Sequence, residues 1–164
     1  MPGCSLGVSS LAPREPRTQQ VRTTRLPDAQ PASLDTQLRN FFDEFSRSSN
    51  ALDLATLGRC FDEVFLAADA TGTKVVPRPA FLQALPRRAQ MFADAGIGQA
   101  VLESLTHQEL DGHYVLVRTA WTAPRTDGSG QVDLASSFLL RRDGDQLRIV
   151  AYITHEGLPQ TTPP

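Results

Sequence analysis

The sequence TAWTAPRTDGSGQVDLASSFLLRRDGDQLRIVAYITH, residues 119–155, carries the strongest structural signal in the chain. Apolar and polar residues alternate along it, which is typical of strands with one buried face. Its turn segments Arg125–Gly130 and Asp143–Gly144 favour chain reversal between antiparallel strands, as does Asp111–Gly112 upstream. The chain after Gly98 is therefore predicted to form four antiparallel strands.

Pairing these strands outward from the turns sorts their side chains onto two faces of a sheet. One face is mostly apolar and is expected to pack against helices. This inner face is predicted to hold Leu102, Ser104, Thr106, Val115, Val117, Thr119, Trp121, Leu134, Ser136, Phe138, Leu140, Leu147, Ile149, Ala151, Ile153 and His155. On the outer face Glu103 and Arg118 interrupt apolar residues such as Leu116 and Tyr152. That mixture is typical of a subunit interface, so we expect a homodimer through the outer face of the sheet.

Helical periodicity dominates the chain before the strands. After Ser33, a capping residue, apolar side chains recur at helical spacing and predict a helix that ends near residues 48–50. A third helix is predicted over residues 80–96. Between them, Asp53 or Asn50 is expected to cap a short helix that leads into a possible strand at residues 64–68. One face of that short helix is predicted to carry Leu54, Leu57, Phe61 and Phe65.

Composition excludes several classes of partner. The chain has 164 residues, 40% of them hydrophobic, and a net charge of -2, which fits one globular domain without a basic face for nucleic acid. No apolar run approaches the roughly 20 residues of a membrane-spanning helix, so we expect no nucleic acid partner, no membrane partner and a cytoplasmic location. Cys4 and Cys60 lack the neighbouring ligands of a zinc site, and no nucleotide fingerprint is present, so no metal and no cofactor are expected.

Three segments are expected along the chain. Residues 1–33 contain five prolines among many Ser, Thr and Gln residues and predict a disordered N-terminal tail. Residues 34–158 are predicted to form one α+β domain. Residues 159–164 form a short C-terminal tail.

The order of these elements, with FLAADATG at residues 65–72 and Trp121 on a central strand, resembles the nuclear transport factor 2-like superfamily. Similar members include SnoaL-like polyketide cyclases, steroid delta-isomerases and scytalone dehydratase. The resemblance implies an α+β fold with three N-terminal helices packed on a curved, mainly antiparallel sheet, which together form a cone-shaped α+β barrel. It also implies a mouth for a small apolar molecule and, commonly, a homodimer.

The steroid isomerases of this superfamily use an aspartate shortly after the D-A-T turn and a tyrosine on the first helix. This sequence has no carboxylate in the corresponding residues 72–75 and has Phe41, Phe42 and Phe45 on its first helix. The resemblance therefore does not carry over the isomerase mechanism.

Small or hydroxylated side chains among large apolar ones on the inner face are typical of a cavity with room and a few polar anchors. Trp121 is expected to be a core anchor or one wall of this cavity, with an indole N–H that can donate. The candidate ligand-binding residues are Phe41, Phe45, Phe61, Phe65, Ser104, Thr106, Thr119, Trp121, Ser136, Phe138 and Ile153.

Asp69 and His155 are the candidate catalytic residues. The imidazole of His155 suits proton transfer near neutral pH, and a hydrogen-bonded carboxylate would raise its basicity. The alternative is that Asp69 caps its own turn and His155 caps the sheet edge.

Three functions remain open from the sequence. The leading hypothesis is a SnoaL-like domain that binds a small, largely apolar molecule, with or without catalysis. The second is a non-catalytic dimerisation or interaction module with a filled core. The third is a cyclase, isomerase or dehydratase that uses the Asp69–His155 pair.

Overall fold

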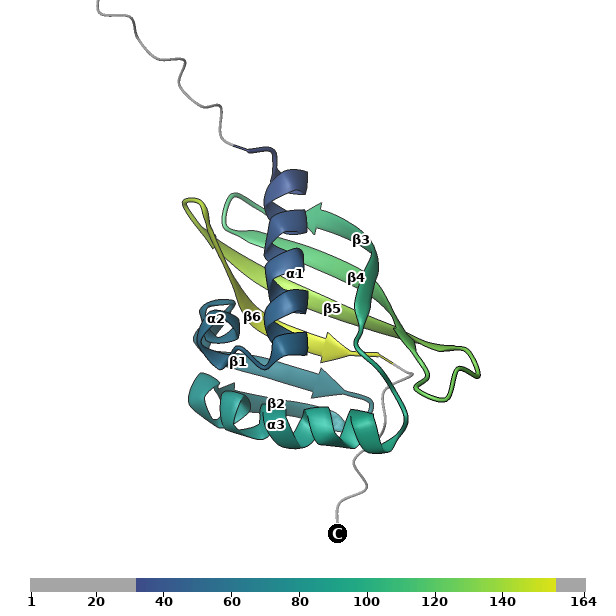
Figure 1. Ribbon diagram of the computed structural model, residues 1–164. Coiled ribbons are helices and arrows are strands. Elements are labelled where there is room, and N and C mark those ends of the chain that lie inside the picture. Colours follow the sequence, from purple (N-terminus) through teal and green to yellow (C-terminus); the bar gives the residue numbers. More distant parts are fainter. Residues whose placement is uncertain (1–31, 156–164) are drawn as a thin grey trace, which may run out of the picture. The chain divides into compact units, whose positions relative to one another are not determined.

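A computed structural model describes residues 32–155 of the chain (Figure 1). The predicted tails, residues 1–33 and 159–164, lie outside this range except for Ala32 and Ser33. The elements in chain order are α1 Leu34–Ala51, α2 Leu54–Arg59, β1 Phe61–Asp69, β2 Gly72–Pro77, α3 Arg78–Asp94, β3 Val101–Glu109, β4 Tyr114–Pro124, β5 Gln131–Asp143 and β6 Gln146–Thr154. None of the helices within residues 32–155 has the length and apolar content needed to span a bilayer.

The first two helices begin at the residues that the sequence indicates. The Ser33 hydroxyl accepts a hydrogen bond from the backbone N–H of Thr36 at 3.3 Å, and Asp53 Oδ1 accepts one from Thr56 N–H at 3.1 Å. Each contact satisfies a helix N–H that has no partner within its helix. Between the helices Leu52 adopts a left-handed conformation (φ 52°) and reverses the chain.

One six-stranded sheet, in the order β2-β1-β6-β5-β4-β3, forms the body of the fold. Every neighbouring pair is antiparallel except β1 and β6, which are parallel. Figure 1 shows α1 crossing one face of the curved sheet and α3 lying alongside β1 and β2. The predicted α+β architecture of helices on a curved, mainly antiparallel sheet is confirmed.

A hairpin of β1 and β2 lies between α2 and α3, where the sequence indicated only one possible strand, at residues 64–68. Phe61 and Phe65 belong to β1, whereas they were expected on the short helix. A spacing of four residues returns a side chain to the same side in both a helix and a strand. Both phenylalanines are therefore buried, as predicted, but on the sheet.

A bulge in β3 reverses the predicted faces of that strand. Leu102 pairs with Trp121 but Ser104 pairs with Ala120, which leaves Glu103 as an extra residue. One extra residue inverts the side-chain alternation beyond it. The predicted inner placement of Ser104 and Thr106 is consequently wrong, because both are exposed on the outer face.

A second bulge affects β6. Leu140 pairs with Ile149 but Leu139 pairs with Ala151, so Val150 is the extra residue. Tyr152, predicted on the outer face, instead stacks on buried Phe138. The predicted inner placement is wrong for Ala151, Ile153 and His155, which lie on the outer face.

Candidate functional site

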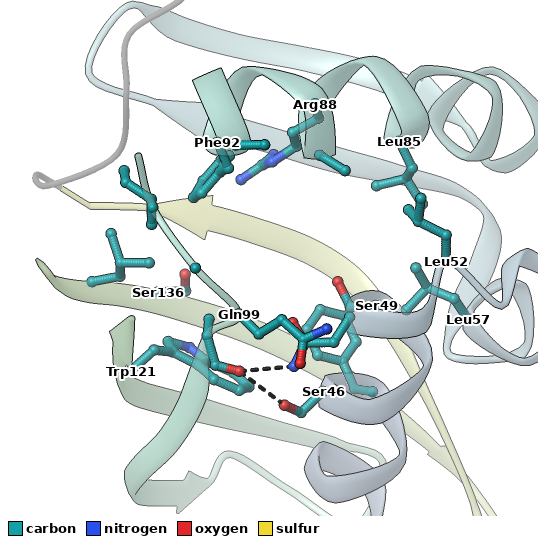
Figure 2. A pocket seen from close by; sticks show the side chains of 18 of the residues that line it. Ser46, Ser49, Leu52, Leu57, Leu85, Arg88, Phe92, Gln99, Trp121 and Ser136 are labelled. Atoms are coloured by element: carbon teal, nitrogen blue, oxygen red, sulfur yellow. Dashed lines mark hydrogen bonds between the residues drawn. The ribbon is translucent and has the colours of Figure 1, made fainter. Parts of the chain in front are cut away.

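A cavity of about 450 Å³ lies between the C-terminal end of α1, helix α3, the segment at residues 97–100 and the inner face of the sheet (Figure 2). Exposed residues such as Ala93, Gln99 and Thr126 contribute to its lining, so the cavity reaches the surface. Its deeper walls are formed mainly by apolar side chains, including Phe45, Leu57, Leu85, Phe92, Ile97, Trp121, Leu134, Phe138 and Tyr152.

Aromatic rings build the wall that the sheet and α1 present to the cavity. The rings of Phe138 and Tyr152 are stacked, with centroids 4.8 Å apart and planes at 4°. Phe45 on α1 packs on Trp121 and Phe138, with centroid separations of 6.1 Å and 5.7 Å. Offset and edge contacts of this kind stabilise aromatic packing beyond the area they bury. The wall is therefore held in place by its own neighbours.

The indole of Trp121 is oriented by a buried hydrogen-bond chain. Its Nε1–H donates to Thr119 Oγ1 at 2.7 Å, and the Thr119 hydroxyl donates to the backbone carbonyl of Ser136 at 3.2 Å. The predicted use of the indole N–H as a ligand donor is not supported, since that donor is already paired. Trp121 instead presents its ring to the cavity.

Polar atoms occupy a few positions on the lining. Ser136 is 5% exposed, lines the cavity, and its hydroxyl makes no hydrogen bond with any of residues 32–155. At the edge, the carbonyl of Ala100 accepts hydrogen bonds from Asn50 Nδ2 at 2.9 Å and Ser46 Oγ at 3.4 Å. Figure 2 shows both bonds, which tie the end of α1 to the segment before β3.

Arg88 brings the only formal charge to the lining residues within the described range. Its guanidinium carbon lies 5.7 Å from the centroid of the Phe92 ring and 6.0 Å from that of Tyr152. Its Nη2 is 3.5 Å from the Tyr152 hydroxyl, at the long limit of a hydrogen bond. None of the ion pairs formed within residues 32–155 involves Arg88.

The predicted ligand-binding residues fall into four groups. Phe45, Trp121, Ser136 and Phe138 line the cavity. Phe61, Phe65 and Thr119 are buried in the core without lining it, and Phe41 lines a separate hollow beside α2. Ser104, Thr106 and Ile153 lie on the outer face of the sheet.

Asp69 and His155 lie apart from the cavity, and no hydrogen bond joins them. Asp69 Oδ1 accepts hydrogen bonds from the Thr71 hydroxyl and from Thr71 N–H at 2.8 Å, which lower the pKa of the carboxyl. His155 Nε2 lies 2.8 Å from Ser137 Oγ. Ser137 stands between Ser136 and Phe138, which face inward, so Ser137 and its partner His155 lie on the outer face of the sheet. Asp69 therefore stabilises the turn after β1, and His155 contacts the neighbouring strand β5 at the end of β6. No group of three metal-ligating side chains occurs within residues 32–155.

Sequence reasoning missed Arg88, Phe92 as a cavity wall, and Tyr152. Arg88 had a detectable signal, because Phe81, Leu85, Arg88 and Phe92 follow one another at helical spacing and put a charge on the apolar stripe of α3. The orientation of Tyr152 had no such signal, because it depends on the bulge at Val150.

The sequence matches a family described as NTF2-like protein (DUF6841) over residues 33–157. No curated protein matches the sequence. The resemblance inferred from the order of elements and the D-A-T turn is confirmed at the level of the superfamily.

Solved structures share the fold at low sequence identity. A protein with a cystatin-like fold from Nostoc punctiforme is 10% identical (TM-score 0.60; 80% of this chain and 96% of that chain covered). An NTF2-like protein from Novosphingobium aromaticivorans is 15% identical (TM-score 0.60; 78% and 83% covered). The protein Aln2 from a Streptomyces species is 17% identical (TM-score 0.60; 80% and 94% covered). Likeness at these identities shows the fold alone.

Proposed function

This chain belongs to the DUF6841 family of NTF2-like proteins, and we propose that it binds a small, largely apolar organic molecule in the cavity between α1, α3 and the sheet. The cavity itself carries the proposal. Its volume of about 450 Å³ lies in the range of small-molecule sites. Rigid aromatic walls with few polar groups are the usual composition of such sites.

The interaction module with a filled core is the less well supported alternative. It requires Phe41, Phe45, Phe61 and Phe138 to pack the interior shut. These side chains contact other parts of the core, yet the space beside Phe45 and Phe138 stays open. An open, mostly apolar space of this size is typical of small-molecule sites, which favours a binding role over a filled core.

Binding is also better supported than catalysis by Asp69 and His155. Neither residue lines the cavity, and its lining within residues 32–155 contains no carboxylate and no imidazole. General acid–base catalysis needs such a group within hydrogen-bond reach of the bound molecule. We therefore propose a binding role without proton transfer by this pair.

A titration with N-phenylnaphthylamine, a neutral fluorescent aromatic, tests the binding proposal. Trp121 is the single tryptophan of the chain and lines the cavity, so saturable one-to-one binding should quench its emission. The variant Ala89→Phe/Ala93→Phe places two rings at the cavity from exposed positions on α3 and should weaken binding by about tenfold or more. Ala84→Phe, exposed on the same helix but outside the cavity, should bind like the wild type. Equal binding by all three proteins would contradict the proposal.

We further propose a homodimer through the outer face of the sheet. The strand registers align a row of apolar side chains across five strands on this face, namely Leu116, Leu139, Ala151, Leu66 and Val75. Leu116, Leu66 and Val75 are 39%, 44% and 70% exposed. A continuous apolar row of this kind is typical of surfaces that associate.

A further inference from the structure

The position of Arg88 in the cavity lining indicates which class of molecule binds there, provided that the proposed binding function holds. Phe81, Leu85 and Phe92 lie on the same stripe of α3 and all line the cavity. Figure 2 shows the Arg88 side chain extending from α3 into the same space. Arg88 therefore occupies a position of α3 at which the helical pattern predicts an apolar residue.

The charge of Arg88 has no counter-charge within the described part of the chain. The cavity lining contains no Asp or Glu in residues 32–155. No carboxylate of that range forms an ion pair with Arg88. Arg88 is partly buried, and a partly desolvated cation without an anion is less stable than a paired one. An anionic group on the bound molecule would remove that cost.

The contacts of Arg88 leave its donors free for such a group. Phe92 and Tyr152 interact with the guanidinium through their rings, and cation–π contacts do not consume N–H donors. Its contact with the Tyr152 hydroxyl, at 3.5 Å, is a weak one. The planar fork of an arginine is suited to two oxygens of one acidic group.

We infer that the cavity takes a molecule with a flat, apolar ring system and one acidic oxygen group, such as a carboxylate or sulfonate, which Arg88 binds. Trp121 and the stacked Phe138–Tyr152 pair contact the ring system. The hydroxyl of Ser136 supplies a second polar contact from the sheet.

Two dyes that differ by one sulfonate group test this inference. Anilinonaphthalene sulfonate carries an acidic group on the ring system of N-phenylnaphthylamine, which is neutral. Arg88→Met should lower the affinity for the sulfonate relative to the neutral dye by about tenfold or more, equivalent to about 1.4 kcal/mol. Arg88→Gln should behave in the same way, and Arg88→Lys should retain part of the preference because it keeps the charge. Arg87→Met removes an exposed charge from the adjacent position and should leave the ratio of affinities unchanged.

The outcomes separate this inference from the proposed function. If both dyes bind the wild type, and the Arg88→Met and Arg88→Gln variants keep the wild-type ratio of the two affinities, the acidic group is wrong and the binding function stands. If neither dye binds the folded wild type, the binding function fails and the inference fails with it. Circular dichroism of each variant confirms that the fold is intact before affinities are compared.

Discussion

The thiol of Cys60 shows how strongly burial acts on a single side chain in this domain. Cys60 follows α2 and is 5% exposed. Its surroundings raise the pKa of the thiol to about 12, chiefly because burial disfavours the thiolate, with a smaller contribution from the charge of Glu44. Only the thiolate reacts with alkylating agents.

Cys60 in a Cys4→Ser variant should therefore react with iodoacetamide at mildly alkaline pH on the order of a thousandfold more slowly in the folded protein than in urea. Mass spectrometry of the alkylated protein over time measures both rates. Comparable rates in the two states would show that the thiol is accessible and ionisable in the native fold.

Residue types alone identified part of the candidate site. Phe45, Trp121, Ser136 and Phe138 were predicted and do line the cavity, because their positions follow from α1 and from the paired strands β4 and β5. Arg88 was not identified, because it adjoins the exposed Arg87 and two neighbouring arginines are typical of a solvated surface. The position of Arg88 on the apolar stripe of α3 indicates the site, whereas its place beside Arg87 in the sequence does not.

At the scale of elements, two bulges account for the largest errors in prediction. The extra residues Glu103 and Val150 each reverse the faces of the strand beyond them. Neither is a glycine or proline, so composition does not mark them. The β4–β5 pairing has no bulge, so pairing outward from the turn at residues 125–130 predicts the faces of both strands correctly.

Four aspartates stabilise the ends of elements and set the response of the fold to acid. Asp53 caps α2, and Asp69, Asp111 and Asp127 accept hydrogen bonds within turns. Each pKa is lowered from 3.8, mainly by the hydrogen bonds that its carboxylate accepts. A carboxyl with a lowered native pKa stabilises the fold above its unfolded pKa and loses that contribution as the pH falls through the native value.

The urea midpoint for unfolding should accordingly fall as the pH drops below about 4. Replacing all four aspartates by asparagine keeps a hydrogen-bonding side chain but removes the titration, so the midpoint of that variant should fall less over the same pH interval. Circular dichroism in urea at several pH values measures both curves. Parallel curves for the two proteins would contradict the assigned roles.

For the molecule as a whole, the order of helices and strands and the D-A-T turn were sufficient to identify the superfamily. The parallel pairing of β1 with β6 was not predictable, because it joins segments more than 80 residues apart in the chain and no turn sequence links them. This pairing completes the sheet that α1 and α3 cover. It also extends the apolar row of the outer face onto β1 and β2.

The proposed homodimer should dissociate when charge is introduced into that row. Leu66→Glu/Leu116→Glu should weaken association by about thirtyfold or more, since like charges would be buried in the interface. Ala55→Glu, exposed on α2, is the matched control and should remain dimeric. Sedimentation equilibrium gives the dissociation constants, and a monomeric wild type at high micromolar concentration would contradict the proposal.

A crystal structure of the protein with anilinonaphthalene sulfonate tests the central claim, that the cavity binds a small molecule, most directly. We expect the ring system to lie against Trp121 and Tyr152, with the sulfonate within hydrogen-bond distance of Arg88. Dye bound only at the outer face of the sheet, with no dye in the cavity between α1, α3 and the sheet, would contradict the account.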